Sequence, residues 1–133
     1  MDKQLCAALA GRASALVEAG DRDEAIGILE ELLRSDLPVF DRAVMCMNIA
    51  IVNGQMGEPE KALENYARAV DLERETESYF IAQSQAAFFS QLGMYQESIR
   101  SYNALLSHPQ LNPESREMFL KNIETLERMA SQP

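Results

Sequence analysis

The segment Gly57-Glu58-Pro59-Glu60-Lys61-Ala62 reads as the end of one helix followed by the start of the next. Glycine suits the left-handed residue that closes a helix, and proline suits the first turn of a new helix. The same arrangement occurs at Gly20–Ala25 and at Gly93–Ser98, where a small residue again follows the glycine by five positions. We therefore predict three units, each made of a helix, a tight turn and a second helix.

The units repeat in register, because the small residues Ala25, Ala62 and Ser98 are 37 and then 36 positions apart. An alanine stands twelve positions before each of them. Small side chains at both points allow two paired helices to approach closely, where a bulky side chain would overpack. The predicted contact pairs are Ala13 with Ala25, Ala50 with Ala62, and Ala86 with Ser98.

These helices predict the organisation of the whole chain. The units span about residues 6–38, 43–75 and 79–109, and a final amphipathic helix spans about 113–130, all in one domain over 1–133. Asp21 and Glu24 have the spacing of a capping box at the start of a helix. The expected apolar face of the final helix consists of Phe119, Ile123, Leu126 and Ala130.

Composition and charge limit the classes of function. The chain of 133 residues is 47% apolar and 25% charged, as in a soluble globular domain, and is rich in good helix formers. Its net charge of −9 repels phosphate backbones and anionic lipids, so we expect no binding to nucleic acid or membranes. Neither a signal peptide nor an apolar run of membrane-spanning length is apparent, which favours a cytoplasmic protein.

On these residues the chain resembles the tetratricopeptide repeat (TPR) family. The shared pattern is a small residue, a larger one, the turn glycine, the small anchor and another large residue. The matching residues are Ala13, Leu16, Gly20, Ala25 and Leu29, then Ala50, Asn53, Gly57, Ala62 and Tyr66, then Ala86, Phe89, Gly93, Ser98 and Tyr102. Asn53 departs from the pattern, because the family has a large apolar residue there. The resemblance implies an all-α right-handed superhelix of three antiparallel helix hairpins with a C-terminal capping helix.

The resemblance also implies a concave groove, lined by the first helix of each unit, that binds a peptide or helix of another protein. The corresponding groove residues are Ala7, Ala10, Gly11 and Ser14, then Val44, Met47, Asn48 and Ile51, then Phe80, Gln83, Ser84 and Ala87. We expect Met47, Ile51 and Phe80 to be exposed on one continuous patch. Because none of the three is ionisable, binding should depend little on salt.

One TPR subtype holds a C-terminal carboxylate with a clamp of Lys, Asn and Arg side chains. The corresponding positions are Ala10, Ser14, Asn48, Phe80 and Ser84. Only the asparagine is retained, and without a cation no charge-assisted hydrogen bond to a carboxylate can form. We therefore do not expect an acidic tail to bind by that route.

The third unit has an uncharged segment, because Tyr79–Gln96 contains no Asp, Glu, Lys, Arg or His. A helix without a charged face is normally buried or covers an interface. We favour internal packing for Phe88 and Phe89, while Phe80 is the better candidate for an interface. Self-association through this third repeat is the other interpretation.

The residues favour no enzyme. His108 precedes Pro109 without a catalytic partner at a suitable spacing, and we expect it to be a solvated loop residue. Gly54-Gln55-Met56-Gly57 lacks the lysine of a phosphate-binding loop. Cys6 and Cys46 are too few for a zinc site or a disulfide scaffold, so both are expected to be reduced. We predict no catalytic residue, no cofactor and no metal.

The leading hypothesis is that the chain is a non-enzymatic protein–protein interaction module, which binds an apolar or amphipathic segment of a partner in its groove. Two alternatives stay open. One is a small acidic TPR-type chaperone that escorts a secreted substrate. The other is a scaffold fragment of a larger protein.

Overall fold

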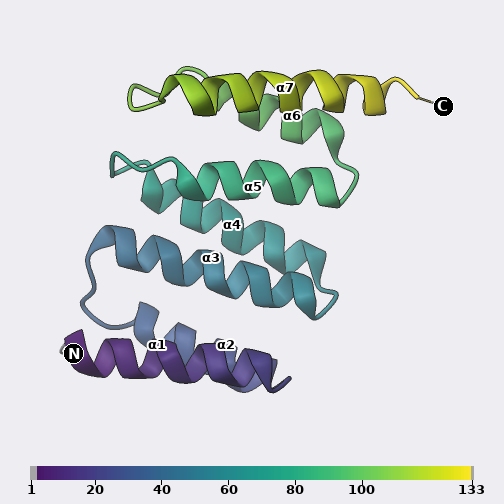
Figure 1. Cartoon of the computed structure of the whole chain (residues 1–133). Coiled ribbons are helices and arrows are strands. Elements are labelled where there is room, and N and C mark those ends of the chain that lie inside the picture. Colours follow the sequence, from purple (N-terminus) through teal and green to yellow (C-terminus); the bar gives the residue numbers. More distant parts are fainter. Residues whose placement is uncertain (1–2, 133) are drawn as a thin grey trace. The chain divides into compact units, whose positions relative to one another are not determined.

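The computed structural model describes residues 3–132, and over this range the chain forms seven helices and no strand. It divides into two compact units, Met1–Thr76 and Glu77–Pro133. The first unit contains α1 (Lys3–Glu18), α2 (Arg22–Leu33), α3 (Val39–Gln55) and α4 (Pro59–Glu73) (Figure 1). The second unit contains α5 (Phe80–Gln91), α6 (Tyr95–Leu105) and α7 (Pro113–Ala130). The three predicted hairpins are therefore α1–α2, α3–α4 and α5–α6, and α7 is the predicted final helix.

The turn glycines have the predicted left-handed conformation, with φ of +88° at Gly20, +74° at Gly57 and +76° at Gly93. In the second hairpin, the N–H of Glu58 donates to the carbonyl of Asn53 at 2.9 Å. The N–H of Gly57 donates to the carbonyl of Gly54 at 3.1 Å. This pair of bonds satisfies carbonyls that the end of a helix leaves free, and the other two turns repeat it.

Of the features predicted at the helix N-termini, one is confirmed and one is wrong. Pro59 stands in the first turn of α4, as predicted. The capping box of Asp21 and Glu24 is wrong, because the Asp21 side chain makes no cap hydrogen bond. Instead, Arg12 on α1 donates to the carboxylate of Glu24 at 3.2 Å. A guanidinium within reach on the neighbouring helix offers Glu24 a charge-assisted bond, which a backbone N–H does not match.

Small and polar residues twelve positions apart face each other across each hairpin. The three predicted pairs, Ala13 with Ala25, Ala50 with Ala62, and Ala86 with Ser98, are all buried. Ser98 Oγ also donates to the carbonyl of Ala86 at 2.7 Å. Asn53 is only 4% exposed and accepts a hydrogen bond of 2.9 Å from Asn65 Nδ2. That bond explains how an amide replaces the large apolar residue of the pattern.

Each unit has its own apolar core. In the first unit, α2 packs against both α1 and α3, and the buried cluster consists of Ala13, Ala25, Ile28, Leu29, Leu32 and Ile49. In the second unit, α7 packs against α6, and the buried cluster consists of Ala86, Tyr102, Leu105, Phe119, Ile123 and Leu126. Three of the four residues expected on the apolar face of α7 are thus confirmed. Ala130 is exposed, because it is the last residue of α7 and lines an open cavity.

The uncharged α5 carries side chains of unequal exposure. Phe88 and Phe89 are half-buried, whereas Phe80 is 58% exposed. In the described part of the chain, no helix combines the length and apolar character needed to cross a membrane.

Candidate functional site

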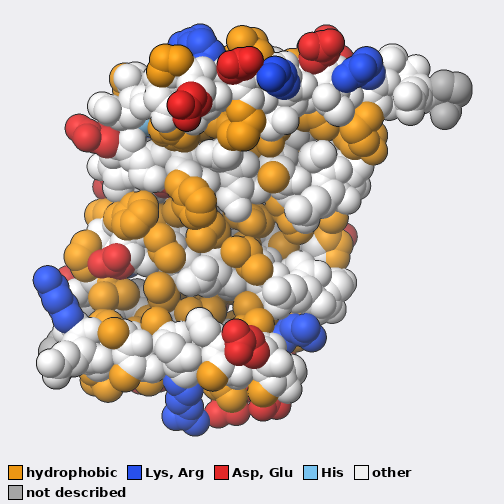
Figure 2. All heavy atoms as spheres, viewed as in Figure 1, with side chains coloured by type: hydrophobic (Ala, Val, Ile, Leu, Met, Phe, Trp, Pro, Cys, Tyr) orange, Lys and Arg blue, Asp and Glu red, His pale blue; other side chains and the backbone are white. Residues whose placement is uncertain are grey.

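A groove runs between α1 and α3 in the first unit. Two open cavities of about 310 and 440 Å³ lie along it, and Ala10 lines both of them. Figure 2 shows apolar side chains gathered where α1 and α3 face each other. We call this feature the α1/α3 groove. It is lined by Ala10, Ala13, Ser14, Val17, Glu18, Leu29, Asn48, Ile51 and Val52 in the smaller cavity, and by Lys3, Cys6, Ala7, Ala10, Leu32, Asp36, Leu37, Pro38, Asp41 and Met45 in the larger.

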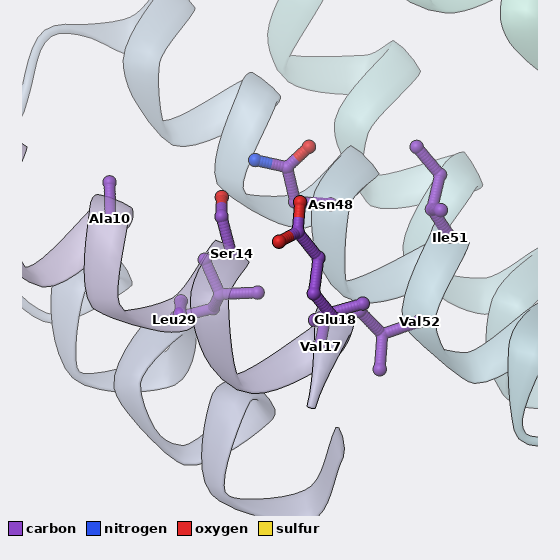
Figure 3. A pocket seen from close by; sticks show the side chains of 9 residues that line it. Ala10, Ser14, Val17, Glu18, Leu29, Asn48, Ile51 and Val52 are labelled. Carbon is purple, nitrogen blue, oxygen red and sulfur yellow. The ribbon is translucent and has the colours of Figure 1, made fainter. Parts of the chain in front are cut away.

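The smaller cavity combines an apolar floor with three polar side chains. Ala13, Leu29 and Val52 are buried and form part of its wall. The Ser14 hydroxyl, the Glu18 carboxylate and the Asn48 amide point into the same space (Figure 3). Within residues 3–132 none of these three side chains forms a hydrogen bond or ion pair. Their acceptor oxygens are therefore available to a ligand.

The larger cavity lies toward the start of α1 and is also mainly apolar. Its charged lining residues are Lys3, Asp36 and Asp41, and all three are exposed. Cys6 lines it as a half-buried free thiol.

Other reactive groups are engaged in packing. His108 is half-buried with its ring 5.0 Å from that of Tyr79, and its Nδ1 accepts from the N–H of Gln110 at 3.1 Å. His108 lies in a loop, as expected, but its ring is only partly solvated, because the Tyr79 ring packs beside it. Burial raises the pKa of the Cys46 thiol, which keeps it protonated and unreactive. In the described residues, no three His, Cys, Asp or Glu side chains are placed to hold a metal ion.

Sequence comparison places this architecture in a known family. The chain matches tetratricopeptide repeat models over residues 8–43 and again over residues 43–76, about half of its length. It belongs to the tetratricopeptide repeat family. No curated protein matches this TPR chain.

Two solved structures share the fold of this TPR chain. PcrH from Pseudomonas aeruginosa aligns with a TM-score of 0.71 and 16% identity, covering 98% of this chain and 96% of PcrH. The first TPR of Spaghetti (RPAP3), bound to the HSP90 peptide SRMEEVD, aligns with a TM-score of 0.67 and 21% identity. That alignment covers 96% of this chain and 99% of the RPAP3 domain. The likeness confirms the expected all-α TPR-like fold.

Some of the groove residues predicted on α1 and α3 lie together in the structure. Ala7, Ala10, Ser14, Asn48 and Ile51 all line the α1/α3 groove. Gly11 and Val44 line neither cavity. Met47 is only 7% exposed, so its expected exposure is wrong. It lies one turn from Ala43 and Ala50 on the inward face of α3, whereas Asn48 and Ile51 lie on the adjacent face.

The other predicted groove residues lie on α5 in the second unit. Gln83, Ser84 and Ala87 are half-buried, and Ala87 lines a separate cavity of about 210 Å³ with residues of α6 and α7. The exposure expected of Phe80 is confirmed. That these α5 side chains form one patch with α3 stays a prediction.

Glu18 lines the smaller cavity but is not among the predicted groove residues, and the same holds for Lys3, Asp36 and Asp41 in the larger cavity. Glu18 follows Ala7, Gly11 and Ser14 at helical spacing, so the same face of α1 that was assigned to the groove reaches it. The expected weak salt dependence considered only Met47, Ile51 and Phe80, none of which is ionisable, whereas Glu18 adds a carboxylate to the α1/α3 groove. Three acidic side chains and one lysine line the two cavities.

Proposed function

We propose that this TPR chain is a non-enzymatic protein-interaction module whose α1/α3 groove binds an apolar or amphipathic segment of another protein. The observation that carries the proposal is the pair of adjoining cavities with an apolar floor and unpaired polar side chains. Apolar area buried in such a groove contributes about 25 cal/mol per Å² before ordering costs are subtracted. The unpaired hydroxyl and amide supply partners for the backbone of a bound segment.

The structural likeness supports a protein partner. The RPAP3 domain of the same fold was solved with a peptide of HSP90 bound to it. The positions that correspond to a carboxylate clamp in this chain include Ala10, Ser14 and Asn48, and all three line the α1/α3 groove. A groove in this place, without clamp cations, suits a segment of different chemistry from an acidic tail.

A steric block of the groove tests the proposal. Ala10 lines both cavities and is half-buried, so Ala10→Trp fills the groove without adding charge. Proteins captured from the native source by the wild-type chain would be identified by mass spectrometry, and their affinities measured for each variant. We expect Ala10→Trp to weaken binding at least tenfold, equivalent to about 1.4 kcal/mol.

Ala67→Trp is the matched control, because Ala67 is exposed on α4 and lines neither cavity. It should retain wild-type affinity, and both variants should keep the wild-type helicity and melting temperature. Equal affinities for wild type and a folded Ala10→Trp variant would exclude the α1/α3 groove as the binding site.

A further inference from the structure

The smaller cavity contains a carboxylate that the fold does not use. Glu18 is exposed and lines this cavity, and within residues 3–132 it has no ion-pair partner. Several other acidic side chains of the first unit are paired with a cation, including Glu24 with Arg12 and Glu58 with Lys61. The Glu18 carboxylate therefore takes part in none of the ion pairs of the described residues.

The position of Glu18 within its helix is electrostatically unfavourable. It is the last residue of α1, and the last turn of that helix contains no basic residue. The C-terminal end of a helix carries partial negative charge, which favours cations and disfavours carboxylates. Helix stability alone would therefore favour lysine over glutamate at this position.

The surroundings of Glu18 form a site for a cation beside an apolar surface. The Ser14 hydroxyl and the Asn48 amide point into the same space as the carboxylate (Figure 3). Val17 and Ile51 line the same cavity. Three acceptor groups that converge in this way match a guanidinium, which has five N–H donors in a fixed plane. The larger cavity adds two aspartates and one lysine, so the groove as a whole is acidic.

We propose that the segment bound in the α1/α3 groove carries an arginine or lysine next to its apolar residues, and that this cation binds the Glu18 carboxylate. This inference rests on the proposed function and specifies the chemistry of the partner. Charge complementarity carries it, because an acidic segment would meet like charge at Glu18. The chemistry is opposite to that of the acidic peptide SRMEEVD bound by the RPAP3 domain.

Selection from a random peptide library tests the proposed chemistry. Phage-displayed random dodecapeptides would be selected against the whole wild-type chain, Glu18→Lys and Glu31→Lys. Glu31 is the matched control, because it is an exposed glutamate near the end of α2 that lines neither cavity. We expect wild type and Glu31→Lys to select apolar peptides that contain Arg or Lys. Glu18→Lys should lose this preference.

A double-mutant cycle then tests the contact itself. A synthetic peptide from the wild-type selection is compared with its Arg→Gln version on the wild-type chain and on Glu18→Gln. We expect the loss of the arginine to weaken binding to the wild-type chain at least tenfold, and binding to Glu18→Gln less than twofold. Equal losses on both chains would overturn the inference.

The outcomes separate this inference from the proposed function. Apolar peptides without a basic preference, still blocked by Ala10→Trp, would refute the role of Glu18 while supporting the groove. Peptides that bind a folded Ala10→Trp variant as tightly as wild type would refute the groove itself. Failure of the wild-type chain to select any peptide would count against both.

Discussion

At the scale of single residues, side-chain volume controls how closely the helices of each hairpin pack. Ala62 on α4 is 0% exposed, and its predicted partner Ala50 on α3 is also fully buried. The third hairpin has a serine in the same place, and its hydroxyl donates to a backbone carbonyl on α5. A buried polar group costs little when its hydrogen bond is made, so serine is tolerated at a position that requires a small side chain.

Enlarging Ala62 should therefore be costly. We expect Ala62→Leu to lower the free energy of unfolding by about 1–3 kcal/mol through overpacking. Ala67→Leu, on the exposed face of the same helix, should change it by less than about 0.5 kcal/mol. Urea denaturation measures both values, and equal small shifts would show that the small pairs do not set the helix separation.

The sequence alone predicts some of these residues and not others. The small pairs and the turn glycines occur at equivalent positions in all three units, so aligning the units predicts where the helices pack closely and where they end. Met47 and Glu18 do not repeat, and their exposure depends on the rotational position of each helix. One residue turns a helix face by about 100°, which is enough to exchange an inward-facing side chain for one in the groove. Aligning the sequence to a repeat locates the turns accurately. It defines the rotation of each helix about its own axis less accurately.

At the scale of elements, the final helix spans Pro113–Ala130, where a helix of about 113–130 is expected, whereas two other helices begin before the expected units. α1 starts at Lys3 and α3 starts at Val39, a few residues before the predicted units. Pro38 precedes α3 with a φ of −55°, which is compatible with the entry to a helix. The predicted units begin where the repeated sequence pattern begins. A helix can start earlier, because the residues before the pattern can also adopt helical conformation.

Two glycines should respond in opposite ways to the same substitution. Gly57 has a φ of +74°, so Gly57→Ala should destabilise the chain by about 1–2 kcal/mol. Gly27 lies within α2, where an added Cβ meets no atom within 4 Å. Gly27→Ala should stabilise the chain by about 0.5–1 kcal/mol. Thermal unfolding of both variants checks the signs, and a shift of the same sign would contradict the turn geometry.

Removing α7 should uncover the apolar face of the second unit. Phe119 is fully buried, with its ring centroid 5.4 Å from Tyr102 and 6.4 Å from Tyr79. A chain that ends at Leu111 loses this cover, and terminal repeats need a polar outer face. We expect dimers or aggregates in sedimentation and reduced helicity in circular dichroism. A chain that lacks only residues 131–133 is the control, and a monomeric, fully helical α7 deletion would refute the capping role.

At the scale of the whole molecule, stability should fall in alkaline solution. Burial raises the pKa of the Cys46 thiol above its usual 9.0 and the pKa of the Tyr102 hydroxyl above its usual 10.0. As pH rises past these usual values, the unfolded chain releases protons that the folded chain still holds. The free energy of unfolding therefore decreases with increasing pH in this range.

Urea midpoints at pH 7.5 and pH 10.5 measure this decrease. Cys46→Ala removes one of these two groups with a raised pKa, so its midpoint should fall less between the two pH values than that of the wild type. An identical fall in both proteins would show that the Cys46 thiol does not contribute.

The twelve-residue separation across each hairpin has a consequence for synthesis of the chain. Contacts between residues so near in sequence close short loops, whose entropic cost is small. Chains dominated by such local contacts have low contact order and fold in microseconds to milliseconds. Translation adds only about 5–20 residues per second, so a hairpin has time to form as soon as its second helix leaves the ribosome. We therefore expect the α1–α2 hairpin to be structured before the codons for α7 are read.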